Sequence, residues 1–295
     1  SEIVRKRPEN DVIITSDANN STQITCEKAK FSIMGQSGED FPYLPYVEKD
    51  YQITISQFTL KEVIRQTIFS IAANDSNKIM TGELFDINGS EMRVVSLDGH
   101  RISIRKILLK SEYEPKKVIV PGKTLTEISK ILTGGTEDIV DIYFTNNHIL
   151  FEFETTVVVS RLIEGNYFRV DQMLTNDYET KVTINKKEFL DCIDRATLMV
   201  KEGDKRPIIL NIAEDVMELK ISSQIGSMDE LINIELEGKN IKIGFNPKLL
   251  IDALRVIDEE KIDIYYMNPK APCFIRDEEQ SYIYLILPVN FIDND

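Results

Sequence analysis

Four segments of the chain carry apolar residues at the spacing of an amphipathic helix, and each follows a short β-rich run. The junctions are alike: ITISQFTL, VIVPGKTL, VTINKKEF and IGFNPKLL each end an apolar, β-branched run and open a helical pattern. Ser56, Asn185 and Asn246 fit helix N-caps, and Pro121 or Pro247 fits a first turn. The pattern therefore predicts helices within residues 56–70, 121–133, 185–201 and 246–257.

The same arrangement recurs along the chain at a nearly constant interval. From Ser56 to Pro121, Asn185 and Asn246 the steps are 65, 64 and 61 residues, which indicates a repeated unit rather than a coincidence among common patterns. Each helix is followed by runs with β-strand character: GELFDIN, EMRVVSL and RISIRKI; IVDIYF, HILFEF and TVVVSRL; PIILNIA, VMELKIS and LINIEL; IDIYY, CFIRD and YIYLIL. Hairpin turns are indicated at Asn88-Gly89, Asp98-Gly99 and Asn146-Asn147. Each unit is predicted to be one helix followed by about three antiparallel strands, which gives an α+β fold.

Pairs of units are expected to form the domains. A helix with one apolar face over a sheet with one apolar face cannot complete a core alone, whereas two such units supply the two layers that a domain needs. This grouping predicts domains at 48–178 and 179–295. Residues 1–47 then form the second half of another domain, because SEIVRKR has the pattern of a helix end and DVIITS, TQITCE and AKFSIMG resemble three strands. We expect the chain to begin inside a repeat unit, which indicates an N-terminal truncation or a missing preceding segment; FPYLP, at 41–45, is the expected crossover between domains.

The charge of the chain is acidic overall but is distributed unevenly. The 295 residues include 49 Asp and Glu against 35 Lys and Arg, a formal net charge of -14 that on a uniform surface would repel nucleic acid and anionic membranes. The four predicted helical windows hold 10 basic and 6 acidic residues, a balance of +4 that leaves the remainder at -18. Each of these cations taken singly is best interpreted as part of a solvated helix face. Together they would form one basic surface if the helices share a side. These cations are Lys61, Arg65, Lys123, Lys130, Lys187, Lys201, Lys248 and Arg255.

The sequence contains few of the residue patterns that are typical of catalytic or metal-binding sites. The chain has three cysteines, Cys26, Cys192 and Cys273, an odd number that includes no CxxC pair. This argues against a disulfide framework or a zinc site. No phosphate-binding loop, dinucleotide fingerprint, HExxH or EF-hand pattern occurs, so we expect no cofactor, no metal and no enzymatic activity. The chain also lacks a signal peptide pattern and an apolar run long enough to span a membrane, which predicts a cytoplasmic protein.

One string, SLDGHR at 96–101, brings together residue types that could support hydrolysis. Asp98 and His100 could act as acid and base, and Arg101 as an anion clamp, which leaves a hydrolase as one hypothesis. Asp-Gly between two apolar runs is first of all a hairpin turn, however, and no nucleophile is marked by a Gly-rich turn. The last predicted strand, YIYLILPVN at 282–290, is apolar at consecutive positions. It therefore suits a strand covered on both faces, whose end could leave an apolar patch for a partner.

Seven strings in register resemble the bacterial DNA polymerase III β subunit, the sliding-clamp family. They are FSIMGQSGEDFPYLP, SLDGHRIS, KVIVPGK, SRLIEGNY, IDRATLM, IKIGFNPKLLIDAL and LILPVN, and the resemblance covers residue 1 to about 291. It implies three domains of paired units that close head to tail as a homodimeric ring around duplex DNA, with helices lining the hole and sheets outside. Such a ring would reconcile a basic lumen with an acidic exterior, and lumen cations would contact phosphates without reading bases. The implied function is a non-enzymatic processivity factor.

The resemblance also implies a peptide-binding pocket for the polymerase III α subunit, the clamp loader and other proteins that carry a clamp-binding motif. Met and aliphatic side chains would form an adaptable apolar slot, with His100 and Arg101 at its rim. The implied lining is Met80, Leu97, Gly99, His100, Arg101, Ile102, Phe168, Met173, Pro272, Leu285, Ile286, Leu287, Pro288 and Val289. Phe168 stands where the family usually has proline, Gln172 where arginine is frequent, and the tail NFIDND lacks a frequent basic residue, so the preferred motif stays open.

Two further surfaces follow from the resemblance. Phe31 and Ile33 would meet Leu198 and Met199 of a second copy at a dimer interface, and Asn74 and Lys78 match a loop that touches DNA, beside the helix cations. The principal alternative is a repeat-built peptide-binding adaptor that does not encircle DNA.

Overall fold

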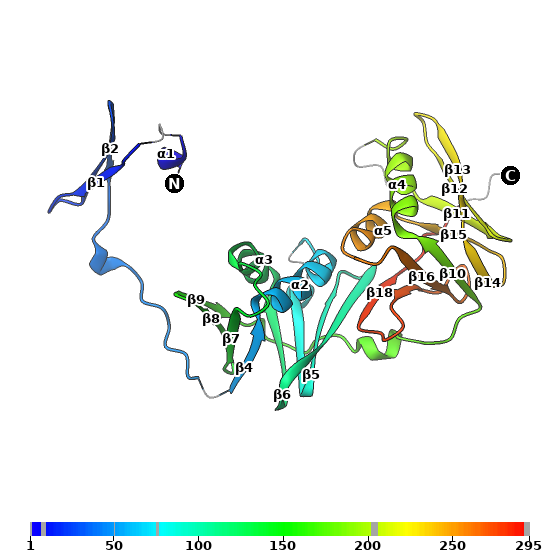
Figure 1. Ribbon diagram of the computed structural model, residues 1–295, viewed down its shortest axis with the longest axis horizontal. Coiled ribbons are helices and arrows are strands. Elements are labelled where there is room, and N and C mark those ends of the chain that lie inside the picture. The colour runs from blue at the N-terminus through cyan, green and yellow to red at the C-terminus, as the bar shows by residue number, and fades with distance from the viewer. Residues whose placement is uncertain (1, 7–9, 50, 75–76, 202–205, 292–295) are drawn as a thin grey trace. The chain divides into compact units, whose positions relative to one another are not determined.

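The chain consists of two compact units, Ser1–Tyr46 and Val47–Asp295, which are described separately. The computed structural model describes residues 2–6, 10–49, 51–74, 77–201 and 206–291. The first unit holds α1 (Glu2–Arg5) and a three-stranded antiparallel sheet of β1 (Ile13–Ser16), β2 (Ser21–Cys26) and β3 (Ala29–Met34) (Figure 1). The short η1 (Gly38–Asp40) and an extended segment follow. The predicted helix end and three strands are confirmed.

All four helices predicted for the second unit are present. They are α2 (Gln57–Thr67), α3 (Gly122–Ile131), α4 (Lys186–Thr197) and α5 (Pro247–Leu254), each ending a few residues before the predicted boundary. The predicted caps are also present: Ser56 Oγ accepts from the Thr59 amide at 3.1 Å, and the Asn185 side chain accepts from the Glu188 amide at 3.0 Å. Asn246 caps α5 in the same way, Pro247 occupies its first turn, and Pro121 precedes α3 without a side-chain cap.

Three antiparallel sheets pack against these helices in the second unit. The strands are β4 (Tyr51–Ser56), β5 (Gly82–Leu97), β6 (Arg101–Pro121), β7 (Ile139–Phe144), β8 (His148–Phe153), β9 (Thr156–Arg161), β10 (Thr180–Asn185), β11 (Ile208–Ala213), β12 (Val216–Ser222), β13 (Ser227–Asn233), β14 (Glu235–Gly238), β15 (Ile241–Phe245), β16 (Lys261–Tyr266), β17 (Cys273–Arg276) and β18 (Tyr282–Ile286). Two four-stranded sheets have the orders β4-β7-β8-β9 and β13-β12-β11-β15, and the third has the order β14-β10-β16-β17-β18-β6-β5. Because β18 pairs with β6, this third sheet joins the two halves of the unit (Figure 1).

Corresponding contacts show that the two halves repeat one construction. The first residue of α2 donates its amide to Asp138 O at 2.7 Å, and the first residue of α4 donates its amide to Glu260 O at 2.9 Å. The Lys61 ammonium binds Leu132 O just beyond α3, and the Lys186 ammonium binds Ile257 O just beyond α5. In each half the first helix packs beside the second, and a lysine of the first neutralises the carbonyl end of the second. The internal repeat inferred from spacing is therefore real.

The predicted turn at Asn88-Gly89 lies inside one strand, β5. Its pairing with β6 shifts register on both sides of Gly89, which has φ +58°, a value that favours glycine. Asp86 and Arg93 are seven residues apart, about 23 Å in a straight strand, yet their side chains form an ion pair at 3.1 Å. The chain therefore reverses at Asn88-Gly89 as predicted, although the strand continues through the bend. The turns at Asp98-Gly99 and Asn146-Asn147 connect β5 to β6 and β7 to β8, as predicted.

Each half of the second unit has its own hydrophobic core between its helices and its sheets. One core includes Leu60, Ile64 and Phe151, and the other includes Phe189, Phe245 and Tyr266, all almost fully buried. A third, smaller cluster lies at the seam where β6 and β18 meet. Every residue of β18 is buried, which confirms the sequence prediction that this strand is covered on both faces.

Candidate functional site

The seam strand β18 brings the tip of the β5–β6 hairpin beside the C-terminal segment. Leu285 lies opposite Ile102, Ile286 lies opposite Arg101, and the amide of Leu287 donates to His100 O at 2.9 Å. Backbone pairing thus holds 100–102 against 285–287, although nearly 200 residues of sequence separate them. These are two of the segments expected to form the peptide slot.

An apolar cluster lies on one face of this seam. Its buried members include Leu97, Ile102 and Leu285, and the half-buried Met80 and Phe168 pack against them. Five of the expected lining residues therefore share one continuous apolar surface. They come from β5, β6, β18, η3 (Lys78–Thr81) and the segment before η4 (Val170–Met173), which explains why no local sequence window reveals the cluster.

Three apolar side chains of the expected slot remain accessible. Met173 is 53% exposed, Leu287 39% and Val289 37%. Pro272 and Pro288 are half-buried, while Gly99 and His100 are exposed at the hairpin tip. Met173 directly precedes Leu174, which packs against the buried cluster, and Leu287 comes two residues after Leu285 of that cluster. Accessible apolar side chains next to a buried apolar cluster can accept apolar side chains of a partner segment.

Two of the expected lining residues face elsewhere. Ile286 is fully buried in the core of the C-terminal half, because alternate residues of a strand point to opposite faces and Leu285 already faces the seam cluster. Arg101 was expected at the rim, but its side chain is only 8% exposed. Its guanidinium contacts Asp98 at 3.0 Å and Asp252 at 2.8 Å, and donates to Phe69 O at 2.5 Å. Arg101 therefore ties the hairpin to α5 and to η2 (Ile68–Ser70), and its assignment to the polar rim is corrected.

The geometry around Asp98 is that of a turn. One carboxylate oxygen accepts from the amides of His100 at 2.9 Å and Arg101 at 3.2 Å, and the other contacts the Arg101 guanidinium. A carboxylate used in this way stabilises the hairpin and does not orient the His100 ring. The arrangement therefore does not favour the hydrolase hypothesis.

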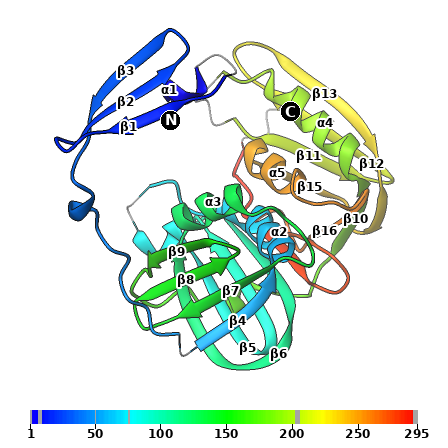
Figure 2. The same ribbon diagram turned by 60° about the vertical axis from the view of Figure 1, so that its left-hand side comes forward.

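The four helices of the second unit lie along one side of it, with the sheets on the other (Figures 1 and 2). The helices therefore meet the condition under which their cations could form one basic surface. Lys123, Lys201 and Lys248 are exposed. Several others are paired: Arg65 with Glu62 and Asp258, Lys130 with Glu127, Lys187 with Asp191, and Arg255 with Asp194. Nearby acids thus offset part of the helix charge.

Known proteins match almost the whole chain. The family models for the central and the C-terminal domain of the DNA polymerase III beta subunit match residues 54–168 and 171–290. Beta sliding clamps of Staphylococcus epidermidis and Staphylococcus aureus are 34% and 35% identical over 291 residues, which is 98% of this chain and 77% of each relative.

The chain belongs to the DNA polymerase III beta-subunit family, the beta sliding clamps.

Solved structures agree with this membership. A putative DNA polymerase III beta subunit of Eubacterium rectale is 68% identical, with a TM-score of 0.91 over 98% of this chain and 79% of that one. The DNA polymerase sliding clamp of Bacillus subtilis is 35% identical, with a TM-score of 0.90 over 99% of this chain and 78% of that one. The DNA clamp fold and the sliding-clamp function therefore apply to this chain.

The residues assigned to the clamp dimer interface are accessible in their own units. Phe31 is 40% and Ile33 44% exposed on β3, while Leu198 is 71% exposed and Met199 half-buried just after α4. Of the residues assigned to the DNA loop, Asn74 and Lys78 are both exposed. The last four residues of the NFIDND tail lie outside the described residues. Among the residues that are described, no helix is long and apolar enough to cross a membrane.

The sequence did not reveal a layer of buried polar residues between the helices and the seam. Ser70 and Ser103 share a hydrogen bond of 2.7 Å, and Ser96 donates to Thr67 O at 2.6 Å. Asp252, which anchors Arg101, lies 151 residues away from it. Serines in apolar strands are the only sequence signal for this layer, and they do not identify their partners.

Proposed function

We propose that this chain acts as a processivity clamp that holds duplex DNA in a ring formed with a second copy. In this proposal one peptide slot on each subunit engages the polymerase III α subunit, the clamp loader and other proteins with a clamp-binding motif. The observation that supports the slot most strongly is the accessible rim of Met173, Leu287 and Val289 beside the buried seam cluster. The rim is built from segments on both sides of the β6–β18 seam.

The proposed slot suits the Leu and Phe side chains of a short linear motif. Met173 is flexible and polarisable, so it can adapt to different partners. Leu97, Ile102 and Leu285 supply an apolar floor, and the exposed His100 supplies a polar contact at the edge. Phe168 packs on this floor beside Tyr167, with ring centroids 6.0 Å apart. Its bulk and the neutral Gln172 are the features that we expect to set motif preference.

The helix side of the second unit is the proposed DNA surface. The exposed cations Lys123, Lys201 and Lys248, with Lys78, can contact phosphates without reading bases. Because ion pairs offset several other helix cations, attraction to DNA is expected to be moderate, as sliding requires. Retention then depends on ring closure rather than on tight affinity.

The proposed domains are 48–178 and 179–295, with 1–47 as the second half of a further clamp domain. The family models match 54–168 and 171–290, which supports two domains in this part of the chain, although their junction lies a few residues before 178. The role is non-catalytic, and the proposed site of action is the cytoplasm, where the replicative polymerase works.

The slot can be tested with a fluorescent peptide that carries a clamp-binding motif. Met173→Asp and Leu287→Asp place a charge where the peptide would bury apolar side chains, and each should weaken binding at least about tenfold. Leu231→Asp is the matched control, because Leu231 is 66% exposed on β13, outside the slot. Fluorescence anisotropy gives the affinities, and thermal unfolding verifies the fold. Wild-type affinity in both slot variants would refute this assignment.

A further inference from the structure

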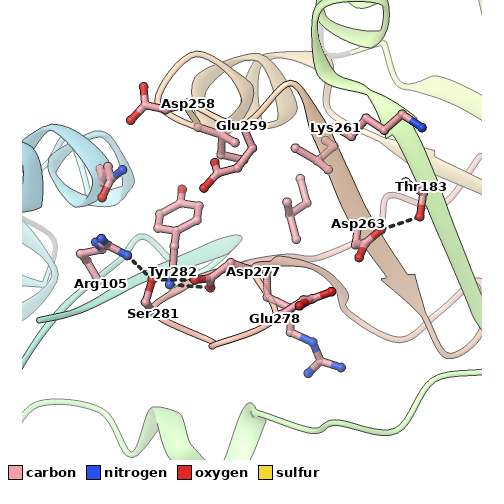
Figure 3. A pocket seen from close by; sticks show the side chains of 15 residues that line it. Arg105, Thr183, Asp258, Glu259, Lys261, Asp263, Asp277, Glu278, Ser281 and Tyr282 are labelled. Carbon is pink, nitrogen blue, oxygen red and sulfur yellow. Dashed lines mark hydrogen bonds between the residues drawn. The ribbon is translucent and has the colours of Figure 1, made fainter.

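A pocket of about 420 Å³ lies at the opposite end of β18 from the proposed slot (Figure 3). Its walls come from both halves of the unit: Gln66 and Arg105 from one, and the segments 257–263 and 275–282 from the other. The volume falls within the range typical of small-molecule sites. None of the residues assigned to the peptide slot, the dimer interface or DNA contact lines it.

Two buried polar groups of the pocket wall have no hydrogen-bond partner among the described residues. They are the Tyr282 hydroxyl and Gln66 Oε1. Tyr282 is only 7% exposed, and Figure 3 shows its hydroxyl directed toward the turn that carries Asp258 and Glu259. The Ser103 hydroxyl, which is hydrogen-bonded to Ser70 at 2.7 Å, lies close enough to lower the pKa of Tyr282, but it forms no hydrogen bond with the tyrosine hydroxyl. A buried polar group without a partner is costly, so a ligand that supplies one is favoured here.

The charge of the lining favours a cationic ligand. Five carboxylates line the pocket, on Asp258, Glu259, Asp263, Asp277 and Glu278, against three cations, Arg105, Lys261 and Arg276. Those cations are engaged: Arg105 with Ser281, Lys261 with Glu235 at 2.7 Å, and Arg276 with Thr175 O at 2.9 Å. In contrast, the Glu259 and Glu278 carboxylates form no ion pair or hydrogen bond within the described part of the chain. The unused groups of the wall are therefore mainly acceptors.

The shape of the lining favours a guanidinium on an aliphatic stem. Gln66, Tyr282 and Glu259 present acceptors from α2, β18 and the turn after α5, and a planar guanidinium offers five N–H donors spread over several directions. Ile257, Ile262 and Ile275 supply apolar wall for methylene groups. We propose that this pocket binds an alkylguanidinium, as carried by an arginine side chain, with Tyr282 and Glu259 as its principal contacts.

The test uses the whole chain and N-acetyl-arginine-amide as the probe, titrated by ligand-observed NMR. We expect saturable binding that the neutral isostere N-acetyl-citrulline-amide does not reproduce. Tyr282→Phe and Glu259→Gln should each weaken it roughly three- to tenfold. Glu260→Gln is the control, because it removes the same charge from the neighbouring residue, which does not line the pocket.

The possible outcomes separate the proposal from its alternatives. Equal binding of the citrulline and arginine probes, no saturable binding, or wild-type affinity in both pocket variants would overturn it. Spermidine binding more tightly than the arginine probe would overturn the guanidinium assignment and indicate a free polyamine instead. Tyr282→Phe should fold normally, since its hydroxyl has no partner to lose, whereas Tyr284→Phe loses a hydrogen bond of 2.7 Å to Leu249 O. If Tyr282→Phe lowers the unfolding midpoint as much as Tyr284→Phe does, the hydroxyl has a structural partner and the proposal fails.

Discussion

Glu83 is a fully buried carboxylic acid at the start of β5, and neither of its side-chain oxygens has a hydrogen-bond partner among the described residues. Burial raises its pKa from an ordinary value near 4.5 to about 8. The nearby Thr67 hydroxyl, which partly offsets this shift, donates instead to Val63 O at 2.7 Å. Glu83 is therefore protonated in the folded protein at neutral pH, in contrast to Arg101, whose buried charge is paired with two carboxylates.

The raised pKa of Glu83 predicts a pH-dependent stability. The folded state holds the proton more tightly than the unfolded chain, so the stabilisation is complete below about pH 4.5 and is lost as pH rises to about 8. Within this window the slope from this one group approaches about 1.4 kcal/mol per pH unit. Glu83→Gln, which cannot ionise, should flatten the dependence and make the variant more stable than the wild type above pH 8. Urea unfolding at a series of pH values measures this.

Glu91→Gln provides the matched control, because Glu91 is exposed on the same strand. It should leave the pH profile unchanged. If Glu83→Gln reproduces the wild-type slope between pH 5 and 8, the account of a neutral buried Glu83 is wrong.

At the residue scale the sequence indicated candidates but not their orientations. It grouped Leu285 and Ile286 in one slot, whereas strand alternation directs them into different clusters. It placed Arg101 at a rim because Asp252 and Phe69, its partners, are distant in sequence. Orientation depends on strand register and on long-range partners, and neither is encoded in a local string.

At the scale of elements, local chemistry determines the helix starts. Ser56, Asn185 and Asn246 each accept a backbone amide of the first turn, and the sequence located all three. Helix ends were less predictable, since apolar periodicity continues past Thr197 and Leu254 into the following segments. The reversal at Asn88-Gly89 was predicted, but the continuity of β5 through it was not, because that depends on pairing with β6.

Removing the N-cap side chain of α4 should lower the stability of the folded protein. Asn185→Ala leaves the Glu188 amide without its acceptor and should lower the free energy of unfolding by about 1 kcal/mol. Lys187→Ala, in the same turn, removes only an exposed ion pair with Asp191. It should change the free energy of unfolding by less than about 0.5 kcal/mol. Chemical denaturation compares the two variants. Equal effects would show that the cap does not contribute.

At the scale of the whole molecule, the first unit buries few of its apolar side chains within itself. Among its described residues Ile24 and Cys26 are buried, whereas Ile13, Ile14, Phe31, Ile33 and Met34 are exposed. Apolar exposure on so small a unit indicates that another surface covers it. In the proposed dimer, Leu198 and Met199 of a second copy contribute that cover.

The dimer interface predicts a change of oligomeric state on substitution. Phe31→Asp and Leu198→Asp would each place a charge in the apolar contact and should convert a dimer into a monomer at micromolar concentration, as measured by sedimentation velocity. Leu108→Asp, at a position that is 83% exposed on β6, should leave the dimer intact. A wild-type protein that sediments as a monomer would contradict the interface.

Charge and topology make separate contributions to DNA binding in this account. Phosphate contacts by helix cations weaken steeply with salt, whereas a closed ring is released only at a DNA end. The acidic remainder of the chain, which brings the formal net charge to -14, keeps non-specific affinity low without affecting a topological link.

The most direct measurement of the central claim is retention on DNA after loading by a clamp loader. Protein loaded onto a nicked circular duplex should remain bound during gel filtration in high salt and should dissociate when a restriction enzyme linearises the circle. A peptide-binding adaptor that does not encircle DNA would be lost from both forms alike. Equal retention on circular and linear DNA, or none on either, would contradict the sliding-clamp account.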